Sequence, residues 1–355
     1  MNITGFEIDF LPVGSGKKNG DAIAIRYLDD NKYKVMVIDG GTKESGEELV
    51  EHIQKYYQTS TVDFVVNTHP DGDHASGLSV VMEKLKIKEL WMHRPWLHSE
   101  KILQYFKDGR ITDNSLAERL KESLGYAYAL EKIAGEKQIT INEPFQGKHI
   151  GPFLILSPSK KNYLDIIPDF EKSPEAKKDE TSVFKNIKET VSNTLEEWGI
   201  ETLSEEASTT ADNESSVILY GLLNKEGILL TGDAGVIALT QAADYADTQK
   251  INLQKCQFIQ IPHHGSRHNV TPAILDRIIG SKVSQVDQPT KNAYVEVAKG
   301  SKEYPRKVVV NAFTRRGVNV FATINGIICH SSNDMPKREG WQKCSPLPFY
   351  DKVED

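Results

Sequence analysis

The chain has 355 residues, of which 39% are hydrophobic and 26% are charged, and its formal net charge is −7. This is the composition of an ordinary globular protein, and the negative charge argues against binding nucleic acid or lipid by bulk electrostatic attraction. No run of 18 apolar residues is present, and the N-terminus lacks a basic stretch followed by an apolar one. We therefore expect neither a membrane span nor a signal peptide. Three cysteines without zinc-type spacing favour a reduced, cytoplasmic protein.

The first quarter of the chain has the pattern of β-strands followed by a helix. Apolar-rich segments at 6–13, 22–27 and 34–38 are separated by turn residues, and the last two are predicted to form a hairpin. A helix is predicted over 46–57. The β-branched run 62–66 then reads as a buried strand that leads into the loop 68–74, and helical spacing resumes over 78–85.

A long helix is predicted over 114–135, with Asn114 as its N-cap and Gly135 as its stop. A strand follows at 153–156. From about 160 to 212 lysines and glutamates crowd together, and an amphipathic helix is predicted over 184–198. We interpret 160–212 as an insertion, which is either a surface excursion or a lid or protein-partner surface.

A strand pattern resumes after this insertion. Strands are predicted at 217–220, 227–230, 258–261, 307–310 and 318–323. Early strand pairs, helices between them and late strand pairs predict two sheets sandwiched by helices, within a single domain spanning 1–355.

The loop after the strand 62–66 places four metal-ligand side chains within six residues: His69, Asp71, Asp73 and His74. A loop that leaves a buried strand can turn all four toward one point. Since Asp73 and His74 are adjacent, we expect them to serve a different metal ion from the one held by His69 and Asp71. The alternative is a polar turn whose aspartates cap the following helix.

Two later segments have matching chemistry. Asp233 follows the apolar strand 227–230, although a Gly-Asp pair is also ordinary turn chemistry. His263 and His264 follow the strand 258–261. Adjacent histidines point in different directions, so we expect one to bind metal and the other to form a hydrogen bond or contact substrate. The alternative is a buried pair of structural histidines.

Jointly these motifs resemble the metallo-β-lactamase superfamily, and more narrowly its competence-related, ComEC-like branch. The segments 20–25, 38–41, 213–219 and 317–326 agree with that branch, and the resemblance covers nearly the whole chain except the insertion and the last two dozen or so residues. The resemblance implies an α/β fold, the αββα four-layer sandwich. It also implies a site for two divalent metal ions with these ligands: His69, Asp71, Asp73, His74, Asp233 and His264.

The sequence departs twice from the commonest pattern of the superfamily. Asp71 stands where a second histidine is usual, and no histidine lies between His149 and His263. Asn213 and Ser216 occupy the stretch where a further ligand is expected, and they either take part in the site or only cap a strand. The resulting oxygen-rich site shifts metal preference from Zn²⁺ towards Mn²⁺ or Mg²⁺.

The resemblance and the ligand types predict a phosphodiesterase or nuclease that acts on nucleic acid or nucleotides through a metal-bridging hydroxide. Asp73 would bind metal and orient that hydroxide, with His263 and Asn213 as further catalytic candidates. Arg267 and His268 are candidates for holding a phosphate oxygen. Two alternatives remain open: hydrolysis of a carbonyl substrate such as a thioester, lactone or β-lactam, and a binding or scaffold module with a degenerate site.

Overall fold

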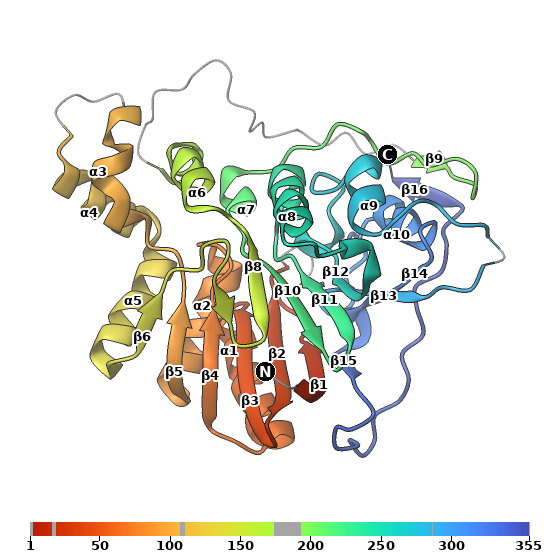
Figure 1. The fold of residues 1–355 in the computed structure, drawn as a ribbon, viewed down its shortest axis with the longest axis horizontal. Coiled ribbons are helices and arrows are strands. Elements are labelled where there is room, and N and C mark those ends of the chain that lie inside the picture. Colours follow the sequence, from red (N-terminus) through yellow and green to blue (C-terminus); the bar gives the residue numbers. More distant parts are fainter. Residues whose placement is uncertain (1–2, 16–18, 107–110, 174–192, 286, 355) are drawn as a thin grey trace.

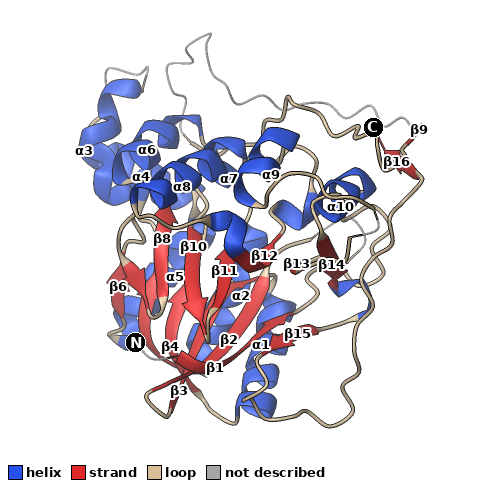
Figure 2. Cartoon of the chain, turned by 45° about the vertical axis from the view of Figure 1, so that its right-hand side comes forward, coloured by secondary structure: helices blue, strands red, loops and turns tan. Residues whose placement is uncertain are grey.

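The computed structural model describes residues 3–15, 19–106, 111–173, 193–285 and 287–354. Two seven-stranded sheets lie face to face, and helices cover the outer face of each (Figures 1 and 2). The expected αββα four-layer sandwich is confirmed. Among the described residues, no helix is both long enough and apolar enough to cross a membrane.

The first sheet has mixed strand directions. Its strands, in spatial order, are β15 (Ile328–Ser331), β1 (Ile3–Phe10), β2 (Ala22–Asp29), β3 (Lys32–Gly40), β4 (Thr61–Val66), β5 (Lys86–Trp91) and β6 (Thr140–Asn142). The strands β3 to β6 run parallel, whereas β15, β1, β2 and β3 pair antiparallel.

The second sheet repeats this arrangement. Its strands are β14 (Val318–Ala322), β13 (Lys291–Val295), β12 (Cys256–Gln260), β11 (Glu226–Leu230), β10 (Ile218–Leu223), β8 (Phe153–Ser157) and β7 (His149–Ile150). The strands β11 to β14 run parallel. A separate small sheet pairs β9 (Asn193–Leu195) with β16 (Lys352–Glu354).

Ten α-helices lie in the described parts of the chain. Those that cover the first sheet are α1 (Lys43–His52), α2 (Gly72–Lys84), α4 (Asp113–Ser123) and α5 (Gly125–Lys137), and those on the second are α8 (Val236–Thr248), α9 (Pro272–Ile278) and α10 (Lys307–Thr314). The short helices are α3 (Ser99–Ile102), α6 (Lys160–Ile166) and α7 (Ala211–Glu214).

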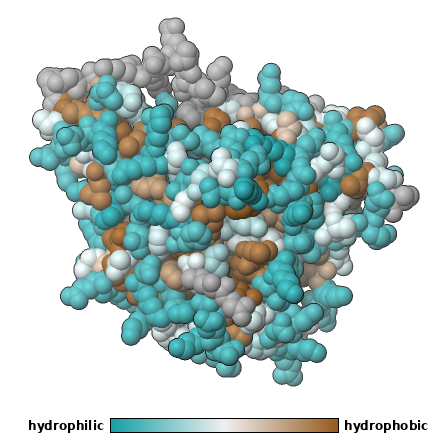
Figure 3. Space-filling view, in the orientation of Figure 1, coloured by the Kyte–Doolittle hydropathy of each residue, from teal (hydrophilic) through white to brown (hydrophobic). Residues whose placement is uncertain are grey.

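The core has three parts, as a four-layer sandwich requires. Alternation along β2 shows the principle: Ile23 and Ile25 point between the two sheets, while Ala22 and Ala24 point towards the helices. Aromatic side chains also pack in the layer between the sheets. The ring of Phe258, for example, stacks on that of Tyr294 with centroids 4.5 Å apart. The outer surface in Figure 3 is mainly hydrophilic, with apolar side chains in separate small groups.

Three local predictions are corrected by the structure. The helix expected over 114–135 starts earlier, after the N-cap Thr112, and breaks at Leu124 into α4 and α5. The strand expected at 307–310 is the helix α10, because β13 and β14 run parallel and parallel neighbours need a crossover connection. Most of the helix expected over 184–198 falls outside the described residues, and Asn193–Leu195 forms a strand because it pairs with the C-terminal β16.

The topology also fixes where polar side chains can gather. Parallel strands end at the same edge of a sheet, and the loops after β4, β11 and β12 carry the three motifs identified in the sequence. Both sheets therefore deliver their motif loops to one edge of the sandwich.

Candidate metal centre

The loop between β4 and α2 presents two buried histidines and two more accessible aspartates. The side chains of His69 and His74 are fully buried, that of Asp71 is 34% exposed, and Asp73 is exposed. Asp71 occupies the N-cap position of α2, but its side chain forms no capping hydrogen bond. Its Oδ2 instead lies 3.6 Å from Nε2 of His69. The side chain of Asp71 therefore does not cap the helix.

The carboxylate of Asp233 is the point on which the histidines converge. Its Oδ2 atom lies within 4 Å of the Nε2 atoms of four imidazoles: His69 at 3.9 Å, His74 at 3.3 Å, His263 at 3.7 Å and His264 at 3.9 Å. The two adjacent histidines thus both point to Asp233, contrary to the expectation that they point in different directions. The side chains of five potential metal ligands therefore meet at this one carboxylate.

Asp39, at the end of β3, orients the first two histidines. Its Oδ2 accepts from Nδ1 of His74 at 2.9 Å and from the hydroxyl of Thr68 at 2.5 Å. Since that hydroxyl gives its one proton to Asp39, it accepts from Nδ1 of His69, 3.0 Å away. Both Nδ1 atoms therefore carry a proton, which leaves Nε2 of each ring, directed at Asp233, as the atom available to a metal ion.

His264 is oriented from the opposite sheet in the same way. Its Nδ1 donates to the backbone carbonyl of Glu296 at 3.1 Å and lies 3.3 Å from Oδ1 of Asp21. Gln260 donates to the other oxygen of Asp21 at 2.8 Å. Burial and the neighbouring Asp21 raise the pKa of the Glu296 carboxyl well above its ordinary value. The resemblance pointed to the segments around Asp21 and Asp39, but sequence reasoning gave neither residue a role.

His263 is held by two amides. Its Nδ1 lies 2.9 Å from Oδ1 of Asn269 and 3.1 Å from Nδ2 of Asn213. Asn213 is buried, so the structure brings this sequence-predicted residue to the site through its contact with His263. In the same segment Oδ1 of Asp212 and Oγ of Ser216 are buried without a hydrogen-bond partner.

Without a cation, charge in the cluster is balanced by the imidazoles. Burial opposes ionisation of Asp233, but the charges of His74, His263 and His264 hold its pKa well below the ordinary value. Burial likewise opposes protonation of His74, but the carboxylates of Asp233 and Asp39 raise its pKa well above the ordinary value. A divalent cation would replace those protons, because metal binding and protonation compete for the same lone pairs.

The donor set fits such a cation. Nε2 of His69, Nε2 of His74 and Oδ1 of Asp233 are buried and have no hydrogen-bond partner, although buried polar atoms are normally paired. Four groups of three side chains bring ligand atoms within 4.8 Å of one another, and they include Asp233–His263–His264 and Asp73–His74–His264. Imidazole nitrogens and carboxylate oxygens are the ligands of zinc and manganese sites in proteins.

Two further candidates from the sequence lie on the loop after β12. Arg267 and His268 follow the histidine pair on the same loop, and both are half-buried. His93, which follows β5, is a core residue: it is 7% exposed and its ring stacks on Tyr163 with centroids 4.1 Å apart.

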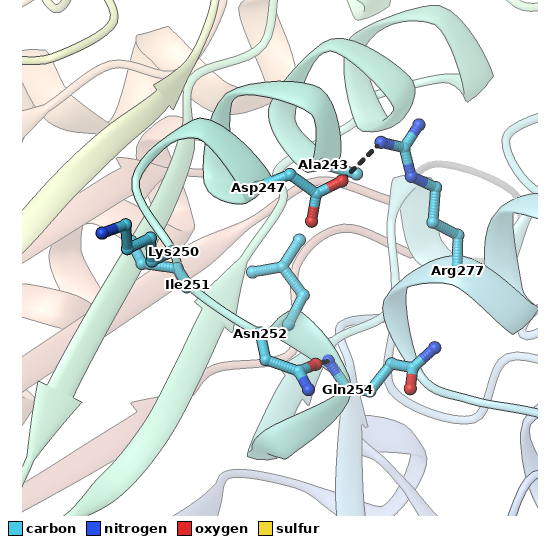
Figure 4. A pocket seen from close by; sticks show the side chains of 8 residues that line it. Ala243, Asp247, Lys250, Ile251, Asn252, Gln254 and Arg277 are labelled. Carbon is cyan, nitrogen blue, oxygen red and sulfur yellow. Dashed lines mark hydrogen bonds and ion pairs between the residues drawn. The ribbon is translucent and has the colours of Figure 1, made fainter.

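A pocket of 440 Å³ lies beside the C-terminal end of α8, but none of the candidate metal ligands lines it (Figure 4). There the guanidinium of Arg277 reaches the carboxylate of Asp247 at 3.0 Å.

Residues 17–152 match the family model of the metallo-beta-lactamase superfamily, and a comparison with curated proteins finds no match. Among solved structures, the chain is similar to the metallo-beta-lactamase fold protein YhfI from Bacillus subtilis, with 9% identity, a TM-score of 0.42, and coverage of 92% of this chain and 100% of that one. It is also similar to a diphosphatase from the PhnP family, with 9% identity, a TM-score of 0.40, and coverage of 93% and 98%.

The matched segment contains the loop with His69 and His74, whereas Asp233 and the adjacent histidines lie beyond it. The structure places those later residues against the matched loop within the two-sheet sandwich. The chain is therefore similar to the metallo-beta-lactamase superfamily over residues 17–152.

Proposed function

We propose that this chain is a metal-dependent hydrolase that cleaves phosphoesters, in particular the phosphodiesters of nucleic acid or nucleotides. The observation that carries the proposal is the convergence of four imidazoles on the single carboxylate of Asp233. In this proposal two divalent cations are held by His69, Asp71, Asp73, His74, Asp233 and His264.

The site needs both sheets. His69 and His74 come from the loop after β4 in the first sheet, whereas Asp233 and His264 follow strands of the second. We therefore propose that residues 1–355 act as one hydrolase domain, with 160–212 as an insertion in it.

The accessible side of the cluster is where a substrate would enter. His69 and His74 are buried beneath it, while Asp71, Asp73 and His263 face solvent to different degrees. Divalent cations in such a site supply positive charge for the substrate oxygens and lower the pKa of water. Asp73 is the exposed carboxylate beside His74 and His264, and in this proposal it accepts a hydrogen bond from the attacking water and orients it.

Phosphoester chemistry suits the remaining residues. Asp71 and Asp73 add oxygen ligands, which suit cations that handle phosphate groups. Arg267 is half-buried beside the histidine pair and would provide a guanidinium for a phosphate oxygen, and His268 would be a second donor.

The test is hydrolysis by metal-loaded protein. Purified protein with added Mn²⁺ or Zn²⁺ is expected to cleave bis-p-nitrophenyl phosphate and an oligonucleotide faster than nitrocefin or a thioester. Asp73→Asn and His264→Gln should each lower kcat by at least about 100-fold, the order of loss for removing a group that acts on the transition state.

Asp30→Asn is a matched control, because Asp30 is an exposed aspartate in the turn between β2 and β3. Faster turnover of nitrocefin or the thioester would instead show carbonyl hydrolysis. A wild-type protein that neither binds metal nor turns over any of these substrates would contradict the enzyme proposal and favour a scaffold.

A further inference from the structure

We propose that His263 is a metal ligand in its own right, and that it takes the place of the histidine missing from the segment before Asp233. This inference rests on the proposed function, because it concerns the same metal centre. It gives the site four imidazole ligands, where the sequence motifs alone indicate three.

The first argument is the direction of the ring. His263 and His264 have φ angles of +46° and +57°, a left-handed conformation that non-glycine residues rarely adopt. Backbone strain of this kind persists where the surrounding structure enforces it, often at functional sites. Here it lets two successive side chains face one centre, with ring centroids 5.4 Å apart and Nε2 atoms 3.7 and 3.9 Å from Asp233 Oδ2.

The second argument is the tautomer of the His263 ring. Asn269 donates through Nδ2 to the backbone carbonyl of Asp233 at 2.9 Å, and a carbonyl can only accept. The side-chain oxygen of Asn269 must therefore face His263, so Nδ1 of His263, 2.9 Å away, carries the proton. Nε2 is then the nitrogen that faces Asp233 and is available to a metal ion, as in the other three histidines.

The third argument concerns Asn213, which lies where the sequence lacks a histidine. Its amide contacts Nδ1 of His263 at 3.1 Å and the hydroxyl of Thr209 at 2.8 Å. Since a hydroxyl can donate or accept, this amide is free to present its oxygen to the same N–H of His263. The segment around Asn213 lacks a metal-binding histidine but positions His263 from another loop. Asn213 is therefore a positioning residue rather than a ligand.

This ligand changes the expected metal preference. With His263 included, the cluster offers four imidazoles and the carboxylates of Asp71, Asp73 and Asp233. Imidazole suits Zn²⁺, whereas carboxylate suits Mn²⁺ and Mg²⁺. We expect the wild-type site to prefer Zn²⁺ over Mn²⁺, and His263→Gln to lose more affinity for Zn²⁺ than for Mn²⁺.

The direct test uses the wild-type protein and does not depend on activity. Long-range ¹H–¹⁵N correlation spectra of the histidine side chains are recorded on chelator-stripped protein before and after addition of Zn²⁺. The Nε2 resonances of His69, His74, His263 and His264 are all expected to move, with the proton remaining on Nδ1. His149, an exposed histidine on β7, is the internal control.

The outcomes separate the two proposals. If the resonances of the other three histidines move and that of His263 does not, the inference is wrong and the metal centre stands. If none moves, the metal centre itself is wrong.

A second measurement compares variants by competition with a chromophoric chelator. His263→Gln is expected to weaken Zn²⁺ binding at least about 100-fold, because losing a ligand should cost no less than losing a residue that only hydrogen-bonds to a ligand. His149→Gln should bind Zn²⁺ as the wild type does. Asn269→Ala should show an intermediate loss of Zn²⁺ affinity. The variant keeps the ring of His263 but removes the acceptor that holds its proton on Nδ1. Equal Zn²⁺ affinity of His263→Gln and wild type would overturn the inference.

Discussion

The carboxylate of Asp39 accepts a hydrogen bond from Nδ1 of His74 over 2.9 Å, although 35 residues separate the two in the sequence. The same oxygen accepts from the hydroxyl of Thr68, which in turn supports His69. One buried carboxylate therefore sets the tautomer of both histidines in the loop after β4. Asp39 has a φ of +52°, so the backbone is held in an uncommon conformation at this position.

Replacing Asp39 by asparagine is expected to weaken metal binding by about 10- to 100-fold, the usual cost of losing a partner behind the ligands. The hydroxyl of Thr68 and Nδ1 of His74 both donate to Oδ2, whereas the backbone N–H of Thr68 donates to Oδ1 at 2.8 Å, so an amide nitrogen in either position faces a donor and breaks the contacts on that side. Zn²⁺ affinity, measured by chelator competition, checks this. Asp30→Asn is the control, since Asp30 has a similar φ of +46° in an exposed turn. Identical affinities in the two variants would show that Asp39 does not orient the histidines.

A second buried network of ion pairs joins the C-terminal segment to β1. Arg338 donates to both carboxylate oxygens of Asp9 at 2.6 and 2.7 Å, and its guanidinium lies 2.9 Å from Glu7. Arg338→Met would leave two buried carboxylates without this partner. We expect the free energy of unfolding to fall by about 3–5 kcal/mol, the range for breaking a buried ion pair from one side.

Chemical denaturation of metal-free protein measures that loss. Arg277→Met is the matched control, because Arg277 bridges Asp244 and Asp247 on the surface, where ion pairs contribute about 0–1 kcal/mol. A loss at Arg338 no larger than that at Arg277 would contradict the assigned role.

A third prediction concerns Glu214, whose carboxylate accepts from the backbone N–H groups of Ile237 and Ala238 at the start of α8. Burial raises its pKa from 4.5 to about 7. The folded protein therefore binds this proton more tightly than the unfolded chain does. Stability from this group is fully present below pH 4.5 and is lost as the pH rises to about 7, at up to ~1.4 kcal/mol per pH unit.

Glu214→Gln keeps an acceptor for α8 but cannot ionise. The free energy of unfolding of this variant, relative to wild type, is expected to rise between pH 4.5 and 7. Urea denaturation at several pH values gives the comparison, with the exposed Glu206→Gln as control. If the free energies of unfolding of Glu214→Gln and wild type change in parallel with pH, the prediction is wrong.

Much of the site could be predicted because its ligands lie in short motifs. The loop from His69 to His74 places its ligands within six residues, and Asp233 and His264 directly follow apolar strands. Their partners could not be predicted in the same way. Asp39 reaches His74 only because β3 and β4 are parallel neighbours. The direction of His263 depends on a left-handed backbone at two successive residues, which the sequence pattern does not indicate.

The fold shows the same division. Alternating and apolar strands predicted the two sheets and hence the four layers, since burial periodicity is local. The valines of 308–310 predicted a strand, yet they form α10 because β13 and β14 need a helical crossover. That requirement appears only when strand order is known. Likewise, β9 exists because the chain's last residues pair with it, more than 150 positions later in the sequence.

The last prediction concerns His93, which is buried against Tyr163 and has no hydrogen-bond partner on either ring nitrogen. Burial lowers its pKa from 6.5 to about 3; Glu143 acts in the opposite direction, while His98 and Lys148 reinforce the decrease. The folded protein thus keeps this ring neutral where the unfolded chain would protonate it. Stability from the neutral ring is fully present above pH 6.5 and is lost as the pH falls towards about 3, by up to ~1.4 kcal/mol per pH unit. This trend with pH is opposite in sign to that of Glu214.

His93→Phe retains an aromatic ring against Tyr163 but cannot bind a proton, so it should resist acid better than the wild type. The free energy of unfolding of metal-free protein, measured from pH 7 to pH 4, should fall less steeply in this variant than in wild type. His149→Gln, on an exposed position of β7, controls for the general loss of histidine and should leave the slope unchanged. If His93→Phe keeps the wild-type slope, the ring is not held neutral by burial, and the acid sensitivity of the fold must come from other groups.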